Sequence, residues 1–108
     1  EALNKFYLEE CNRVFKEEIE VCKKCFSELP DFTLKLRKMR TRWGVCNIRN
    51  KTITLNTELL KKDLALIDYV IIHEFSHLIH GDHSSRFWKL VEENMPDYKK
   101  YKEEMKEF

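Results

Sequence analysis

The residues best suited to chemistry lie in His73-Glu74-Phe75-Ser76-His77, an H-E-x-x-H sequence. Residues four apart on a helix lie one turn above each other, so the imidazoles of His73 and His77 can converge on one metal ion. Glu74 is rotated by about 100° from His73 and can reach a water on the open side of that ion. Zinc lowers the pKa of a bound water to about 7, and a nearby carboxylate then takes the proton as general base. The spacing therefore predicts a metal-activated water.

A catalytic zinc site usually has three protein ligands and one open position, so a third ligand is expected. His83 follows His77 by six residues and comes after Gly81, where the chain can leave the helix and turn back. His80 is the competing candidate, but a third ligand on the same helix would crowd the two already there. We therefore favour His83. Asp82 is a weaker candidate for the third ligand than His80, and it is a candidate for orienting one of the histidines.

The helix that carries these groups is predicted from Asp63, a suitable N-cap, to Ile79. Its apolar residues, expected to face the core, are Leu64, Ile67, Val70, Ile71, Phe75 and Leu78. Buried imidazoles and a buried carboxylate on so apolar a helix would be costly without partners. That cost favours a metal centre over histidines that only fill the core or lie on the surface.

The elements before this helix are read from periodicity. A long amphipathic helix is predicted over residues 1–29, because apolar residues recur there at steps of three and four. Three short extended runs follow at 32–39, 42–48 and 52–56, and the first alternates apolar and polar side chains as a half-buried strand does. The polar turn at 49–51 predicts a hairpin between the last two.

Two more helices should close the chain, one over residues 84–94 and one that starts at Pro96, a favoured first-turn residue. The last helix presents on one face Tyr98, Tyr101, Met105 and Phe108. The predicted fold class is α+β: a small antiparallel three-stranded sheet packed on a central active-site helix, with flanking N- and C-terminal helices.

The length of 108 residues and the hydrophobic content of 43% predict one domain over residues 1–108, with a core that needs no disulfides. The first residue is Glu1 rather than Met, which indicates a domain excised from a longer chain. No apolar stretch approaches the roughly 20 residues of a membrane span, so no membrane partner is expected. Four cysteines without a signal peptide favour a reducing compartment, and the predicted location is cytoplasmic.

Charge is unevenly distributed along the chain, although the net charge is only +1. Residues 31–62 carry nine basic and two acidic side chains, whereas both flanks are net acidic. Such a strip can bind phosphates or acidic peptides. It lacks the basic and aromatic interleaving of a nucleic-acid groove, so we favour a solvated strand face.

Some further residues have two interpretations. Trp43 and Gly44 lie on a strand expected beside the active-site helix, where Gly44 would allow close backbone approach and the strand could pair with an extended substrate. Trp43 is equally well explained as a core aromatic.

Cys22 and Cys25 form a lone C-x-x-C within a predicted helix, and for these and Cys46 we favour core packing. The candidates for a second electrophile that stabilises an oxyanion are Arg86, Tyr98 and Arg42.

Several motifs together resemble those of the YgjP-like metallopeptidases, which are relatives of the SprT and Wss groups within the zincins. The motifs are H-E-F-S-H-L at 73–78, H-S-S-R-F-W at 83–88, R-W-G-V-C at 42–46, I-T-L-N at 53–56, D-Y-V at 68–70 and P-D-Y at 96–98. The resemblance covers residues 35–101 and implies a zincin-like fold. It implies as zinc ligands His73, His77 and His83, with Glu74 as the catalytic acid/base. Val45 stands where the family usually has Ser, so no role for a hydroxyl carries over to that position.

The leading hypothesis is therefore a zinc-dependent metallopeptidase with one catalytic ion. Its partner would be a peptide or protein substrate, of a specificity that the motifs do not name. The alternative is a zinc-containing module that binds protein or nucleic acid with little turnover. Salt-dependent DNA binding that is lost when the basic strip is neutralised would favour the alternative.

Overall fold

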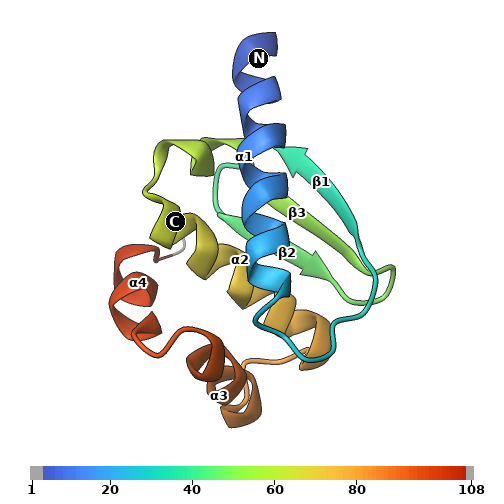
Figure 1. Cartoon of the computed structure of the whole chain (residues 1–108), viewed down its shortest axis with the longest axis vertical. Coiled ribbons are helices and arrows are strands. Elements are labelled where there is room, and N and C mark those ends of the chain that lie inside the picture. Colours follow the sequence, from blue (N-terminus) through green and yellow to red (C-terminus); the bar gives the residue numbers. More distant parts are fainter. Residues whose placement is uncertain (1–3, 107–108) are drawn as a thin grey trace.

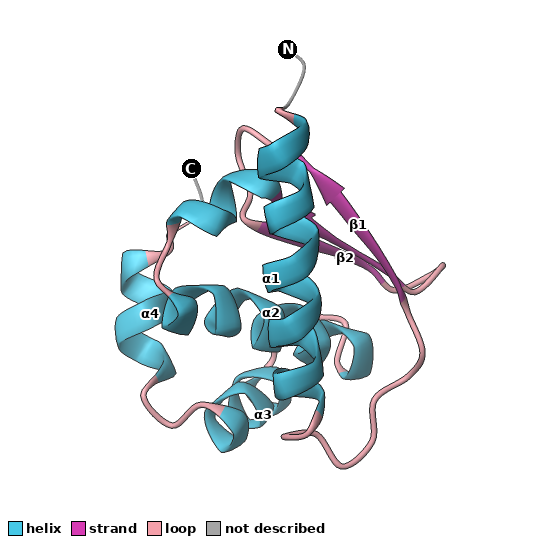
Figure 2. Ribbon diagram, turned by 45° about the horizontal axis from the view of Figure 1, so that its top comes forward, coloured by secondary structure: helices cyan, strands magenta, loops and turns pink. Residues whose placement is uncertain are grey.

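The computed structural model describes residues 4–106 and has a helix at its centre (Figure 1). The elements are α1 (Lys5–Lys23), β1 (Thr33–Arg37), β2 (Gly44–Asn47), β3 (Thr52–Asn56), the 3-10 helix η1 (Thr57–Lys61), α2 (Leu64–Ile79), α3 (Ser85–Asn94) and α4 (Tyr98–Glu104). Figure 2 shows the strands on one side of the molecule and α3 and α4 on the other, with α2 between them and α1 lying across. The class is α+β as predicted, and η1 was not predicted.

The sheet is mixed, so the prediction of an antiparallel sheet is wrong for one of its two pairings. The strand order is β1-β3-β2, with β1 parallel to β3 and β2 antiparallel to β3. Residues 38–43 carry the chain from one side of β3 to the other, where 48–51 then form the predicted hairpin turn. Alternation predicts which face a side chain takes, but it does not predict which strand lies next to which. As a consequence β2 is an edge strand.

The first helix is shorter than predicted. It starts after Asn4, whose Oδ1 accepts a hydrogen bond of 2.8 Å from the Phe6 amide. It ends at Lys23 rather than at residue 29, because the following amides bond to carbonyls three residues back in a tight last turn. Phe26 stays in the core through that turn and packs edge-on against Phe75 of α2, with ring centroids 5.6 Å apart.

The ends of α2 match the predicted bounds but not every predicted role. Asp63 takes the N-cap position without a side-chain capping bond, and Leu64, predicted to face the core, is 55% exposed. At the other end the chain leaves the helix through His80 in an extended conformation, and no glycine has a positive φ. Gly81 instead allows the chain to pass close to the Ile48 side chain, because a Cβ on residue 81 would lie 2.8 Å from Cδ1 of Ile48.

The two C-terminal helices flank α2 as predicted. Helix α3 is capped by Ser84, whose Oγ accepts from the Phe87 amide at 3.5 Å. Pro96 lies in the turn before α4 and not in its first turn, since α4 begins at Tyr98. Phe108, expected on the same face, lies outside the described residues. Among the helices of residues 4–106, none has the length and apolar character needed to cross a membrane.

Candidate active site

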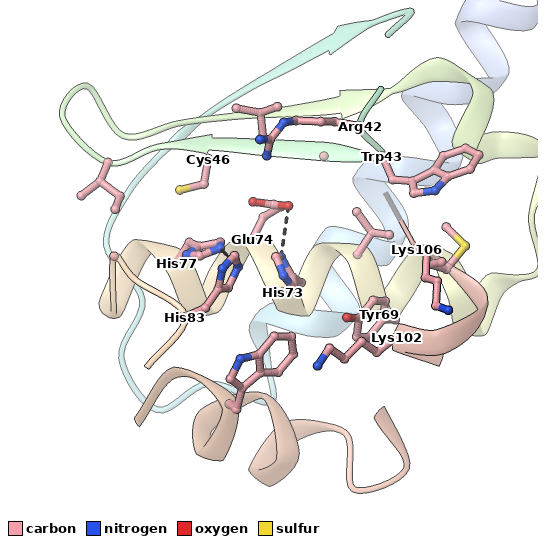
Figure 3. A pocket seen from close by; sticks show the side chains of 17 residues that line it. Arg42, Trp43, Cys46, Tyr69, His73, Glu74, His77, His83, Lys102 and Lys106 are labelled. Atoms are coloured by element: carbon pink, nitrogen blue, oxygen red, sulfur yellow. Dashed lines mark hydrogen bonds and ion pairs between the residues drawn. The ribbon is translucent and has the colours of Figure 1, made fainter. Parts of the chain in front are cut away.

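Three histidines converge beside α2. His73 and His77 come from neighbouring turns of that helix, and His83 comes from the loop that precedes α3 (Figure 3). One ligand atom from each lies within 4.8 Å of the others, and the Nε2 atoms of His77 and His83 are 3.0 Å apart. His80 is not part of this group, so over the described residues the geometry favours His83 over its competitor.

Aromatic side chains of α3 hold the imidazole rings. Phe87 stacks on His77 with centroids 4.3 Å apart, and Trp88 stacks on His83 at 5.7 Å. His73 meets Phe87 edge-on at 5.1 Å. Phe87 and Trp88 of α3 therefore orient imidazoles from two separate segments, so that His83 on its loop is held in place as well as the two histidines of the helix.

Glu74 is buried between α2 and the edge strand β2. Glu74 is only 4% exposed, and its Oε2 lies 3.3 Å from Nδ1 of His73. Gly44 faces it from β2, where an added Cβ would lie 3.0 Å from that same oxygen. The predicted close approach at Gly44 is thus made by the Glu74 carboxylate of the protein itself.

Two of the histidines are biased toward the neutral form. Burial lowers the pKa of His77, with Glu74 opposing the shift and the other two histidines adding to it. Burial and then His73 lower the pKa of His83, again against Glu74. Neutral imidazole is the form that binds metal ions. The three imidazoles beside a buried carboxylate fit a metal ion in their donor chemistry.

A cleft of about 530 Å³ opens over these groups. Its apolar wall includes Trp43, Ile48, Val70, Trp88 and Met105, and its charged lining residues are Arg42, Glu74, Lys102 and Lys106. Of the three candidates for an oxyanion partner, Arg42 lines the cleft, whereas Arg86 and Tyr98 do not.

Tyr69 also lines the cleft and was not among the predicted site residues. It lies one helical turn before His73, with ring centroids 5.9 Å apart, and it is 5% exposed. Its spacing of four residues from the first histidine was the signal that could have identified it. The same spacing suits a core residue, so sequence alone could not separate the two roles.

The remaining predictions have mixed outcomes. Asp82, a candidate for orienting a histidine, accepts a hydrogen bond of 3.3 Å from the Ser84 amide instead. Cys22 is buried as predicted, but Cys25 is exposed. Cys46 is half-buried in the wall of the cleft, and burial, followed by the charge of Glu74, raises its pKa to about 11.

The profile of the YgjP-like metallopeptidase domain matches residues 1–108. The chain belongs to the YgjP-like metallopeptidase family. The resemblance read from the motifs is thereby confirmed, and the three histidines are the group of this domain that could hold its metal.

Two solved structures are similar to the domain. One is the metallopeptidase zymogen abylysin of Pyrococcus abyssi, with a TM-score of 0.75 and 24% identity, covering 83% of this chain and 90% of that one. The other is the metallopeptidase zymogen jannalysin of Methanocaldococcus jannaschii, with a TM-score of 0.64 and 16% identity, covering 87% and 91%. This likeness confirms the zincin-like fold. No curated protein sequence matches the chain significantly.

Proposed function

We propose that this domain is a zinc-dependent peptidase in which His73, His77 and His83 hold the ion and Glu74 is the general base. The observation that carries the proposal is the convergence of three imidazole nitrogens within 4.8 Å beside a buried carboxylate. Nitrogens that share a tetrahedral zinc lie about 3.3 Å apart, given Zn–N bonds of about 2.0–2.1 Å. The separation of 3.0 Å between His77 and His83 needs little adjustment to meet this.

When bound, zinc would polarise the scissile carbonyl and lower the pKa of a water. Glu74 then takes the proton of the attacking water and returns it to the leaving amine. Burial suits this role, because electrostatic interactions are stronger where water is excluded. Arg42 is the sequence candidate that lines the same cleft, and we assign to it the second positive charge for the oxyanion.

The edge strand supports a peptide as substrate. In the strand order β1-β3-β2, β3 pairs with β1 on one side and with β2 on the other. The outer edge of β2 therefore has no neighbouring strand in this sheet, and β2 lines the cleft. An extended peptide can add to such an edge through backbone hydrogen bonds. Gly44 and Cys46 of β2 both line the cleft, so a chain paired there would pass close to Glu74.

The test is the Glu74→Gln variant, compared with Glu92→Gln, which removes an exposed carboxylate outside the cleft. Metal content is measured by mass spectrometry of the purified proteins, and hydrolysis is measured on a complex peptide mixture. Glu74→Gln should keep one zinc per chain, and its rate of hydrolysis should fall by at least about 10²-fold. Glu92→Gln should keep both the zinc content and the hydrolysis rate of the wild type. Cleavage retained by Glu74→Gln would refute the assigned base. A zinc-loaded wild type that cleaves no peptide would refute the peptidase function.

We also propose a reducing, cytoplasmic location for the domain. It carries four free cysteines, of which Cys11 and Cys22 are buried in the core. Fractionation of cells that express the domain with its native flanking sequence tests this. Recovery in a secreted or periplasmic fraction would contradict it.

A further inference from the structure

The charged groups around the cleft are unbalanced. Its lining includes three cationic side chains, Arg42, Lys102 and Lys106, against one carboxylate, Glu74. That carboxylate is buried and belongs to the reacting centre. A bound metal dication would make the cleft still more positive. The surroundings of the scissile bond therefore favour a negative group on the substrate.

Lys102 differs from the nearby lysines Lys100 and Lys106 in how its ammonium group is held. Nζ of Lys100 lies 3.5 Å from the carboxylate of Asp97, and Nζ of Lys106 lies 2.9 Å from that of Glu103. Within residues 4–106, Lys102 has no such carboxylate partner. Its Nζ lies instead 4.3 Å from the centroid of the Trp88 ring, a cation–π contact.

Trp88 links this lysine to the metal-binding group. The indole of Trp88 stacks on His83 with centroids 5.7 Å apart and on Tyr98 at 5.5 Å, so this side chain of α3 is held between the loop that carries His83 and helix α4. Figure 3 shows Lys102 on the α4 side of the cleft and Arg42 on the strand side, with the histidines between them.

We propose that the cleft selects peptides that carry a carboxylate close to the scissile bond, and that Lys102, held over Trp88, is the specificity-determining residue that binds it. This rests on the proposed peptidase function and names its substrate class. An ammonium group already held over the Trp88 ring loses less conformational entropy when it binds a substrate carboxylate than the ammonium of a freely moving lysine does. The carboxylate can come from an Asp or Glu side chain or from the C-terminus of a short peptide.

The test uses alanine-based heptapeptides with blocked ends and a central Glu, Gln or Lys. It also uses an all-alanine heptapeptide with either a free or an amidated C-terminus. Cleavage is followed by mass spectrometry, with kcat/KM measured for the wild type, Lys102→Met and Lys102→Glu. Lys100→Glu is the matched control, because it reverses a charge on the same helix outside the cleft. The wild type should favour Glu over Gln by about fivefold, the upper range for one exposed ion pair.

Lys102→Met should remove this preference, Lys102→Glu should turn it toward the Lys peptide, and Lys100→Glu should leave it unchanged. Raising the salt concentration should weaken it. A preference for the free terminal carboxylate over an amidated end would assign the carboxylate to the C-terminus. The proposal would be overturned if the wild type cleaved the Glu and Gln peptides at equal rates and also showed no preference for the free terminal carboxylate. A carboxylate preference that survives in Lys102→Glu would overturn it as well, and either result would leave the peptidase function intact.

Peptide binding to zinc-loaded Glu74→Gln separates a failure of the carboxylate site from a failure of the proposed peptidase function. Trp43 and Trp88 line the cleft, so intrinsic fluorescence can report binding of the same peptides. Tighter binding of the Glu peptide, lost in the double variant with Lys102→Met, supports the carboxylate site even if the wild type hydrolyses nothing. A single-stranded 20-mer of DNA is added as a competitor. If it displaces the peptides while the Glu and Gln peptides bind equally, the cations serve a nucleic acid and the proposal is wrong.

Discussion

At the scale of single residues, Gly44 decides where the Glu74 carboxylate can lie. A Cβ at this position would lie 3.0 Å from Oε2 of Glu74 and 3.0 Å from Cγ1 of Val70. Gly44→Ala should therefore displace the carboxylate by a few tenths of an ångström and lower kcat about tenfold, because reacting groups tolerate little misplacement. Zinc content should stay at that of the wild type, because the three atoms nearest to the added Cβ belong to Glu74 and Val70 and not to a histidine.

Gly81→Ala is the control for this prediction. The added Cβ would meet only the end of the Ile48 side chain, which is 44% exposed and can move away. Its effect on kcat should be much smaller than that of Gly44→Ala. Equal kcat values for Gly44→Ala and the wild type, at full zinc occupancy, would show that the position of Glu74 is not set by β2.

The third ligand gives a second prediction at this scale. If all three histidines bind zinc as proposed, the ion would stabilise the folded domain by about 2.7 kcal/mol when free zinc is 100 times its Kd. His83→Ala should lose most of the zinc-dependent rise in Tm, whereas His80→Ala should keep it. The measurement is thermal unfolding with and without a chelator. A normal rise in His83→Ala and a lost rise in His80→Ala would exchange their roles.

The convergence of the three histidines was the most predictable feature of the candidate site. The helical spacing of His73 and His77 follows from a repeat that any helix imposes. The choice of His83 over His80 was argued from crowding on the helix, from a turn at Gly81 and from the family resemblance. The surroundings of these groups could not be predicted, because they depend on contacts between segments distant in sequence. Trp88 stacked on His83 and Lys102 over Trp88 are such contacts.

At the scale of elements, one buried side chain holds the segment between β1 and β2. Nδ2 of Asn56 donates to the carbonyls of Met39 at 3.0 Å and Arg42 at 2.8 Å. Its Oδ1 accepts from the amides of Met39 at 3.3 Å and Glu58 at 2.9 Å, and Asn56 is fully buried. This side chain therefore supports the crossing that carries β2 to the far side of β3 and places Arg42 at the cleft.

Asn56→Ala should destabilise the domain by about 2–4 kcal/mol, because it leaves several buried backbone groups without partners. Asn94→Ala is the matched control, since the Asn94 side chain makes one hydrogen bond of 2.9 Å to the Leu90 carbonyl. Its loss should be about 1 kcal/mol or less. Urea unfolding of the zinc-loaded proteins measures both. Similar losses in the two variants would mean that the segment holds its conformation without Asn56.

The same bonds explain what could and could not be predicted about the sheet. The bounds of β3 and the hairpin from β2 to β3 follow from local residues, and both are confirmed. The parallel pairing of β1 with β3 depends on the path of residues 38–43, which Asn56 holds from a distance in sequence. Local periodicity carries no information about that path, so the antiparallel expectation failed there.

At the scale of the whole molecule, the packing of α1 on α2 encloses an acidic side chain. Oδ1 of Asp68 is buried without a hydrogen-bond partner among the described residues. Burial, then a hydrogen bond with Glu18 and the charge of Glu18, raise the pKa of Asp68 to about 7, against an opposing hydrogen bond from Cys22. The contact between these two helices therefore favours a protonated carboxyl.

This shift couples the stability of the whole domain to pH. The native state retains the Asp68 proton up to about pH 7, whereas the unfolded chain releases it near its ordinary pKa of 3.8. The native state thus binds more protons than the unfolded state between these values, so the contribution of Asp68 to stability falls as pH rises from about 4 to 7. The carboxyl is only half-buried, and solvent screening reduces the expected loss to about 1–2 kcal/mol.

Asp68→Asn replaces the carboxyl with a neutral amide of the same shape. It should therefore remove the pH-dependent contribution of Asp68 to the free energy of unfolding. Relative to the wild type, the variant should gain about 1–2 kcal/mol between pH 4 and pH 8, with most of the gain complete by pH 7. Urea unfolding of both zinc-loaded proteins at each pH measures it, and taking the difference cancels the titration of the histidines. Glu18→Gln should give a smaller gain of the same sign, because it removes the neighbouring charge that helps to raise the pKa of Asp68. A difference between Asp68→Asn and the wild type that does not change with pH would show that Asp68 is ionised in the native state and that the contact between α1 and α2 holds a charged carboxylate.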